Sequence, residues 1–236
     1  MKLTSEELKC LDEIRSFLVK LKANLSQKIA GRQLNSHSKL PFKLYSMRGV
    51  LAHRVSELAE VAAELFETKK IVPAIILTRA VFETTAVLYF LYNKLKDVIE
   101  KKTLDDIDDV LKKFLFGGRT KAAPVESYNI LTAINHTDKT FRSYRKAYDD
   151  LSEFAHPNWS GVSGAYSKFD RNTMILYLGK KYSNVPLMMA LPLLAGSLML
   201  FCHYYDAMDQ YCSEFNELCD EIYKKKIQQA HPADRE

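Results

Sequence analysis

The sequence predicts an all-α protein: a helical bundle with long N- and C-terminal helices and a small β-hairpin insertion. Apolar residues recur every three or four positions over most of the chain, as they do on one face of a helix. Only 8 Gly and 7 Pro occur in 236 residues, too few for a turn-rich β architecture. Because no repeat or linker divides the sequence, we expect one helical domain over residues 1–236.

The N-terminal half predicts three helices. The first begins with a capping box, in which Thr4 is followed three residues later by Glu7, and its apolar pattern continues to Ile29. A second helix is expected from about residue 43 to 68. A third opens near Pro73 and is apolar on almost every side, which places it at the centre of the bundle.

Shorter helices follow in the second half. A charged segment predicts an exposed helix that ends at Gly117, and another short helix is expected after Pro124. Asp138 is expected to cap a helix that stops near Pro157.

The last part of the chain predicts the hairpin and the final helix. The hairpin is expected at 164–178, around a turn near Asp170. The C-terminal helix is expected over 185–228, and residues 229–236 are predicted to be a disordered tail.

The net charge and the cysteine content limit the possible partners and the cellular location of the protein. The net charge of +5 permits an anionic partner without requiring one. No CxxC pair occurs, and no signal peptide is visible, so we expect a reducing, cytoplasmic location. The four cysteines are Cys10, Cys202, Cys212 and Cys219.

One stretch raises the question of a membrane. Residues 182–205 contain no Lys, Arg, Asp or Glu, and such a run is long enough to span a bilayer. Pro186, Pro192 and Gly196 interrupt it, and helical periodicity resumes directly afterwards. We therefore expect a core helix in a protein outside the membrane, with a single span at 185–203 as the alternative.

The first polar candidates are Arg79 and Glu83, four residues apart on one face of the most apolar helix. Charges among apolar residues must be paired, or they destabilise the fold by several kcal/mol. Two interpretations stay open: a structural bridge that fixes the helix register, or a polar pocket inside the bundle.

A second polar stripe lies on the helix before Pro157. Arg145, Asp149, Ser152 and His156 follow one another at helical spacing, and His156 stands at the helix end, where the dipole favours its protonated form. Basic residues such as Arg142, with interleaved tyrosines, could hold phosphates and stack on bases of RNA.

Metal chemistry is a further alternative, and we do not favour it. Glu153 and His156 have the Glu-x-x-His spacing of carboxylate-bridged di-iron bundles, which need two such motifs. The sequence contains one, so we expect neither a metal nor another cofactor.

Three segments together resemble bacterial proteins related to the HEPN helical superfamily: HRVSELAE, ILTRAVFETTAVLYFLY and YDDLSEFAHPNWSG. They lie between His53 and Gly161, and the last one has an LSxxxHPxxxG pattern. The resemblance implies a compact helical bundle that often dimerises. Many such proteins are metal-independent ribonucleases of toxin–antitoxin or phage-defence systems, so it also implies RNA and a protein such as an antitoxin as partners.

The family motif is an arginine, four to six residues, and then a histidine. His156 matches the histidine, whereas positions 149–151 hold Asp, Asp and Leu in place of the arginine. Arg145 lies too early on the helix, so Arg79 from another helix would have to supply the charge.

These observations give two functional hypotheses. In the first, the chain acts on RNA, with His156, Arg79 and Glu83 as catalytic residues that converge in one pocket. Its substrate-binding residues would be Arg145, Ser152, Asn158 and Arg142. In the second, the chain is a non-catalytic dimeric interaction module with a structural polar core. The apolar stripe of the first helix, which has no evident partner in the bundle, would form the dimer seam.

Overall fold

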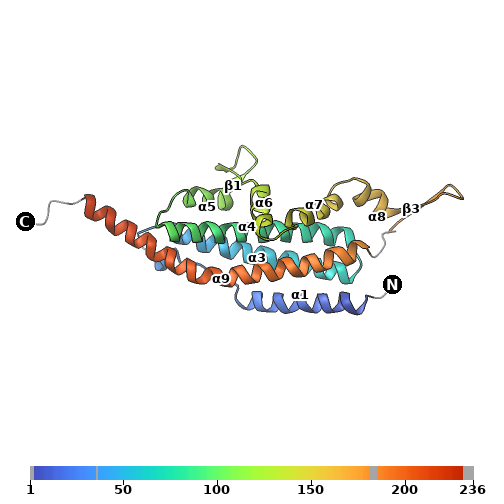
Figure 1. Ribbon diagram of the computed structural model, residues 1–236, viewed down its shortest axis with the longest axis horizontal. Coiled ribbons are helices and arrows are strands. Elements are labelled where there is room, and N and C mark those ends of the chain that lie inside the picture. Colours follow the sequence, from blue (N-terminus) through green and yellow to red (C-terminus); the bar gives the residue numbers. More distant parts are fainter. Residues whose placement is uncertain (1–2, 36, 181–184, 231–236) are drawn as a thin grey trace, which may run out of the picture.

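The protein is an all-α bundle, as the sequence predicts, in a computed structural model that describes residues 3–35, 37–180 and 185–230. Three long helices form its body: α3 (Leu40–Glu67), α4 (Ile71–Lys101) and α9 (Val185–Ala230). Helix α1 (Ser5–Ala23) packs along α3 and α9, and the shorter helices lie on the opposite side of α4 (Figure 1).

Helix α1 begins as predicted and ends earlier than predicted. Thr4 is its N-cap, and its backbone N–H donates to the carboxylate of Glu7 at 2.7 Å while the Thr4 hydroxyl accepts from the Glu7 N–H at 3.2 Å. The helix ends at Ala23, not near residue 29, because the N–H of Asn24 bonds to the carbonyl of Leu21 and closes the last turn.

The apolar stripe of α1 has its partner within the chain. Leu11 and Ile14 are fully buried, and Leu18 and Leu21 almost so, against α3 and α9. The expectation that this stripe lacks a partner in the bundle is therefore wrong, and it no longer supports a dimer seam.

Helix α4 occupies the centre, as its sequence predicts. Leu88, Leu91 and Leu95 are completely buried, and α4 packs along both α3 and α9. A short helix, α2 (Gly31–Leu34), lies in the segment predicted to break the chain before α3.

The other side of α4 carries α5 (Ile107–Phe116), α6 (Ile130–Thr140) and α7 (Tyr144–Ala155). Between α5 and α6 the chain forms a short parallel pair that the sequence did not indicate, β1 (Gly117–Gly118) with β2 (Val125–Glu126). The helix expected after Pro124 starts later, at residue 130, because Asn129 caps it by accepting the N–H of Leu131 at 3.0 Å.

Asp138 caps α7 from an unexpected place. It lies inside α6, and its carboxylate accepts the backbone N–H of Arg145, in the first turn of α7, at 2.9 Å. Asp138 thus contacts the start of the helix, but the prediction that the helix begins there is wrong: its N-cap is Ser143, where the chain turns with φ 73°.

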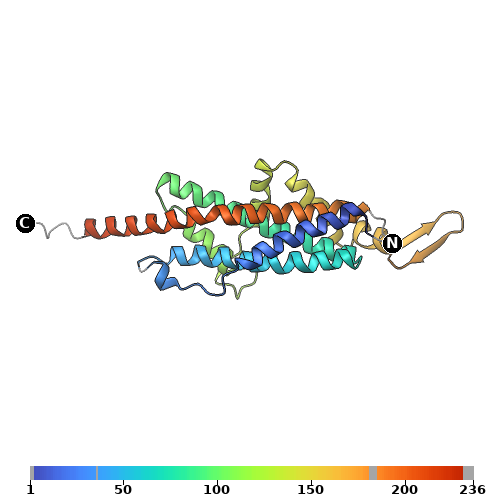
Figure 2. The same cartoon turned by 90° about the horizontal axis from the view of Figure 1, so that it is seen from below.

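The predicted hairpin is present. Strands β3 (Ser167–Asp170) and β4 (Ile175–Leu178) pair antiparallel, and the carboxylate of Asp170 accepts the N–H of Asn172 in the turn. The hairpin projects beyond the end of the bundle at which α1 begins (Figures 1 and 2). A π-helical turn, η1 (Trp159–Ser163), and the short α8 (Gly164–Tyr166) connect it to α7.

Helix α9 runs the length of the bundle and continues past the other helices at its C-terminal end (Figure 2). Two helices are long and apolar enough to cross a membrane, Ile71–Lys101 and Pro186–Gln229. The most apolar stretch of the first is 67% buried within the protein, and that of the second 44%. These values do not assign a location, so a cytoplasmic protein outside the membrane stays a prediction. Residues 229 and 230 of the predicted tail are helical, and 231–236 lie outside the described residues.

Candidate functional site

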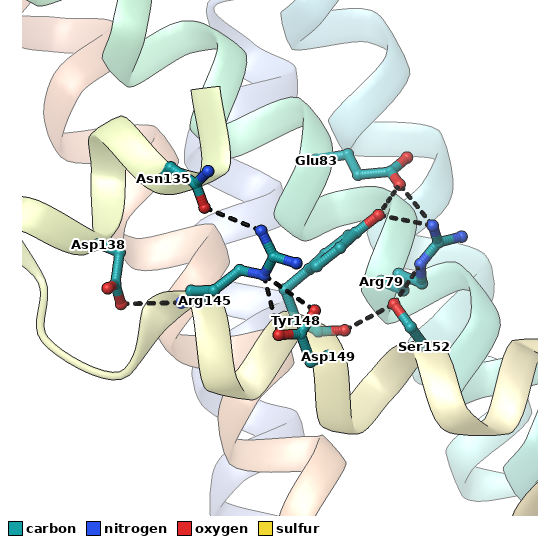
Figure 3. Close-up of polar contacts among 8 residues, drawn as sticks. All are labelled: Arg79, Glu83, Asn135, Asp138, Arg145, Tyr148, Asp149 and Ser152. Carbon is teal, nitrogen blue, oxygen red and sulfur yellow. Dashed lines mark hydrogen bonds and ion pairs between the residues drawn. The ribbon is translucent and has the colours of Figure 1, made fainter. Parts of the chain in front are cut away.

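Arg79 and Glu83 form the predicted ion pair. They lie one turn apart on α4 and face α7, with Arg79 Nη2 3.1 Å from Glu83 Oε1 (Figure 3). Their side chains are 29% and 23% exposed, so the pair reaches the surface and is not enclosed by apolar residues as expected. The difference arises because α7 covers this part of α4 with polar groups.

Helix α7 supplies those groups through Tyr148 and Ser152. Arg79 donates from Nη2 to the Tyr148 hydroxyl at 2.6 Å and from Nε to the Ser152 hydroxyl at 2.8 Å. Tyr148 in turn donates to Glu83 Oε1 at 3.1 Å, and Ser152 donates to the carbonyl of Tyr148 at 2.8 Å. The guanidinium also lies 4.9 Å from the centre of the Tyr148 ring. We call these four residues the α4–α7 cluster.

His156 is not part of this cluster. Its backbone N–H donates to the carbonyl of Ser152 at 3.3 Å, which places it one turn further along at the end of α7, and its side chain is exposed. Within the described part of the chain, the imidazole makes no hydrogen bond. The geometry therefore joins Arg79, Glu83 and Ser152, whereas His156 faces solvent beside them.

Arg145 belongs to a second polar group on the other side of α7. Its Nε donates to the Asp149 carboxylate at 2.8 Å, and its Nη1 donates to Asn135 of α6 at 2.9 Å (Figure 3). Successive helical residues turn by about 100°, so Tyr148 and Ser152 lie nearer to α4 and Asp149 nearer to α6. The predicted stripe of four residues is in this way divided between two neighbouring helices.

Asn158 shapes the loop after α7. Its Nδ2 donates to Glu153 at 2.6 Å, and its Oδ1 accepts the N–H of Gly161 at 3.2 Å, which starts the π-helical turn. A Cβ on Gly161 would lie 2.4 Å from the carbonyl oxygen of His156, so only glycine fits. The histidine and glycine of the LSxxxHPxxxG pattern are thus in direct backbone contact. Arg142, by contrast, is exposed between α6 and α7 and makes no polar contact with any residue that the structure describes.

Sequence reasoning missed two groups. Tyr148 was the one member of the cluster it did not name, although its position four residues before Ser152 puts both on one face. It also missed a second ion pair, in which Arg48 Nη1 lies 2.6 Å from Asp209 and Nη2 donates to the Tyr205 carbonyl at 2.7 Å. Arg48 is buried over the Tyr205 ring, 4.0 Å from its centre, so it ties α3 to α9.

An aromatic group surrounds His136 on α6. Its ring lies 5.8 Å from that of Tyr89 and 5.3 Å from that of Phe90, both on α4. Burial lowers the pKa of His136, and the charge of Lys139 lowers it further. Among the described residues, no group of three or more His, Cys, Asp or Glu side chains could hold a metal ion.

Comparison of the chain with protein-family models, with characterised proteins and with solved structures finds no match. The HEPN-like resemblance therefore stays a prediction, and the site must be interpreted from its own geometry.

Proposed function

We propose that the chain is a non-catalytic interaction module, and that the α4–α7 cluster is its structural clamp. The observation that carries this proposal is the shared set of contacts: Glu83 Oε1 forms an ion pair with Arg79 and accepts from Tyr148, and the Arg79 guanidinium also donates to Ser152. A general base needs a lone pair directed at its substrate, and a phosphate-binding arginine needs free N–H groups. Here Arg79 Nε and Nη2 are directed at α7 and at Glu83, and Glu83 Oε1 is directed at Arg79 and Tyr148; Arg79 Nη1 and Glu83 Oε2 have no partner among the described residues.

The clamp positions the part of the chain that can meet a partner. Helix α7 has only three buried residues, Tyr144, Tyr148 and Leu151, so apolar packing alone holds it weakly. The hydrogen bonds of Arg79 add a directional link to α4. Through the turn around Gly161, the position of α7 then determines where the β3–β4 hairpin leaves the bundle.

RNA contact is the second candidate function, and one observation favours it. Trp159 is 75% exposed and is the first residue of the π-helical turn η1, three residues after His156. A free indole ring can stack on a base, and a neighbouring imidazole can exchange a proton with a ribose 2′-hydroxyl. In this hypothesis, Arg142 would contact phosphate, and the protein would act as a metal-independent ribonuclease of a toxin or defence system.

A binding and cleavage assay separates the two functions. Labelled single-stranded RNA is incubated with the wild-type protein and with the His156→Ala, Trp159→Ala and His203→Ala variants, without metal. His203 is an exposed histidine on α9 and serves as the matched control. The interaction module predicts intact RNA and equally weak binding by all four proteins. Cleavage that disappears only in His156→Ala would replace this proposal with the ribonuclease.

A further inference from the structure

The β3–β4 hairpin has an apolar face that nothing in the described structure covers. Its register places Phe169 opposite Leu176, and Leu178 lies on the same face two residues further along β4. These side chains are 48%, 52% and 74% exposed. An isolated two-stranded hairpin is at best marginally stable in water, so a projecting apolar face indicates a binding partner.

A complementary surface lies on the same chain, along the first half of α9. Met188, Pro192, Gly196 and Met199 follow one exposed stripe of this helix, and no charged side chain interrupts it. Met188 and Met199 are 61% and 54% exposed, in keeping with the low burial of this stretch. An exposed helix face of a monomer usually carries charged residues instead.

A pocket opens beside this stripe, where the start of α1 meets α9. Its volume is about 320 Å³, and Glu7, Cys10, Met188 and Pro192 are among its lining residues. Glu7 is only 5% exposed, and its Oε1 has no hydrogen-bond partner among the described residues. Such an acceptor is costly to leave unpaired, but it lies beneath the surface, so the pocket offers a partner mainly apolar contact. We call the pocket and the stripe together the α1–α9 groove.

The charges of the two surfaces are opposite. Lys168 and Arg171 of the hairpin, with Lys180 just after it, outnumber Asp170, whereas the exposed Glu6 and the buried Glu7 line the pocket.

We propose that the α1–α9 groove binds the apolar face of the β3–β4 hairpin of a second copy of this chain. The hairpin and the start of α1 lie at the same end of the molecule (Figure 2). Two copies joined at that end by a two-fold axis therefore exchange hairpins reciprocally and close the assembly. This inference rests on the proposed interaction function and names its partner.

Two double variants test the pairing by light scattering. The hairpin variant, Leu176→Asp with Leu178→Asp, and the groove variant, Met188→Glu with Met199→Glu, both change exposed side chains, so circular dichroism should show unchanged helix content. The wild-type protein should have the mass of a dimer, and each variant that of a monomer. Ile175→Asp with Tyr177→Asp changes the opposite face of the same strand, so this matched control should stay dimeric.

A mixture of the two variants provides the decisive measurement. One intact hairpin–groove pair remains available between them, so a tagged hairpin variant should retain the untagged groove variant, while neither retains itself. A monomeric wild-type protein, dimeric variants or a mixture without association would each overturn the inference. Association of a monomeric wild-type protein with anionic lipid vesicles, lost in the hairpin variant, would instead identify the hairpin as a membrane arm.

The failure of this inference is distinguishable from that of the proposed function. If both variants stay dimeric, the chain still associates, through a surface other than the hairpin. RNA cleavage that depends on His156 would overturn the interaction function without changing the result for the hairpin.

Discussion

Replacement of Arg79 by alanine measures what the α4–α7 cluster contributes to stability. The substitution removes the ion pair with Glu83 and the hydrogen bonds to Tyr148 and Ser152. A fully buried pair broken in this way costs about 3–5 kcal/mol, because the remaining charge is left without a partner. Here Glu83 keeps the hydrogen bond from Tyr148, and water can reach both side chains. We therefore expect a loss of roughly 2 kcal/mol, between the values for buried and exposed pairs.

The chain offers a matched control for this experiment. Arg145 and Asp149 have the same spacing, but their side chains are 36% and 52% exposed. Arg145→Ala should therefore lower the free energy of unfolding by less than about 1 kcal/mol. Both variants are compared with the wild-type protein by urea denaturation, with the same slope expected for all three. Equal losses for the two arginines would refute the clamp.

A double-mutant cycle tests the role of Tyr148 within the same cluster. Tyr148→Phe keeps the ring under the guanidinium and removes the hydroxyl that joins Arg79 to Glu83. Because the two residues share partners, the losses from Arg79→Ala and Tyr148→Phe should not add. Strict additivity would show that the hydroxyl does not link the pair.

Two further predictions follow from buried titratable groups. Burial lowers the pKa of His136 below its usual value of 6.5. At this position the unfolded chain therefore binds a proton more readily than the folded one. The free energy of unfolding should fall as the pH drops below about 6.5. Urea denaturation between pH 7 and 5 should show a smaller fall for His136→Phe, and an equal fall would contradict the assignment. Burial raises the pKa of Cys212 to about 12, so iodoacetamide at pH 8 should label it only after unfolding. Labelling of the native protein at the rate of a free thiol, measured by mass spectrometry, would show that Cys212 is accessible.

The long helices could be predicted because their apolar periodicity extends over many turns. The α1 capping box and the central place of α4 follow from residues close together in the sequence. The end of α1 could not be predicted, since Leu25 continues the apolar pattern after Asn24 has closed the helix. The β1–β2 pair was equally hidden, because two-residue strands have no periodicity and depend on contacts with α5.

The candidate site was predicted in part. The spacing of Arg79 and Glu83 was sufficient to identify their ion pair, because it is local to one helix. The sequence was not sufficient to identify the residues that contact this ion pair, since these depend on how α7 is rotated against α4. That rotation brings Tyr148 and Ser152 to the ion pair and leaves His156 in solvent. The expected catalytic group of His156, Arg79 and Glu83 was inferred because each polar residue needs a hydrogen-bonding or charged partner. That need does not determine which residues lie close together in the fold.

The packing of α9 between α1, α3 and α4 has a consequence for synthesis of the chain. During translation, α4 is complete long before α9, since α5, α6, α7 and the hairpin are made in between. The apolar face of α4 therefore stays exposed until α9, its main packing partner, has been synthesised. Intermediates with such exposed apolar surface aggregate readily. Truncation before Phe215 and Cys219, which are buried late in α9, should leave a chain that depends on chaperones. Helix α9 is in this sense the one that completes the core.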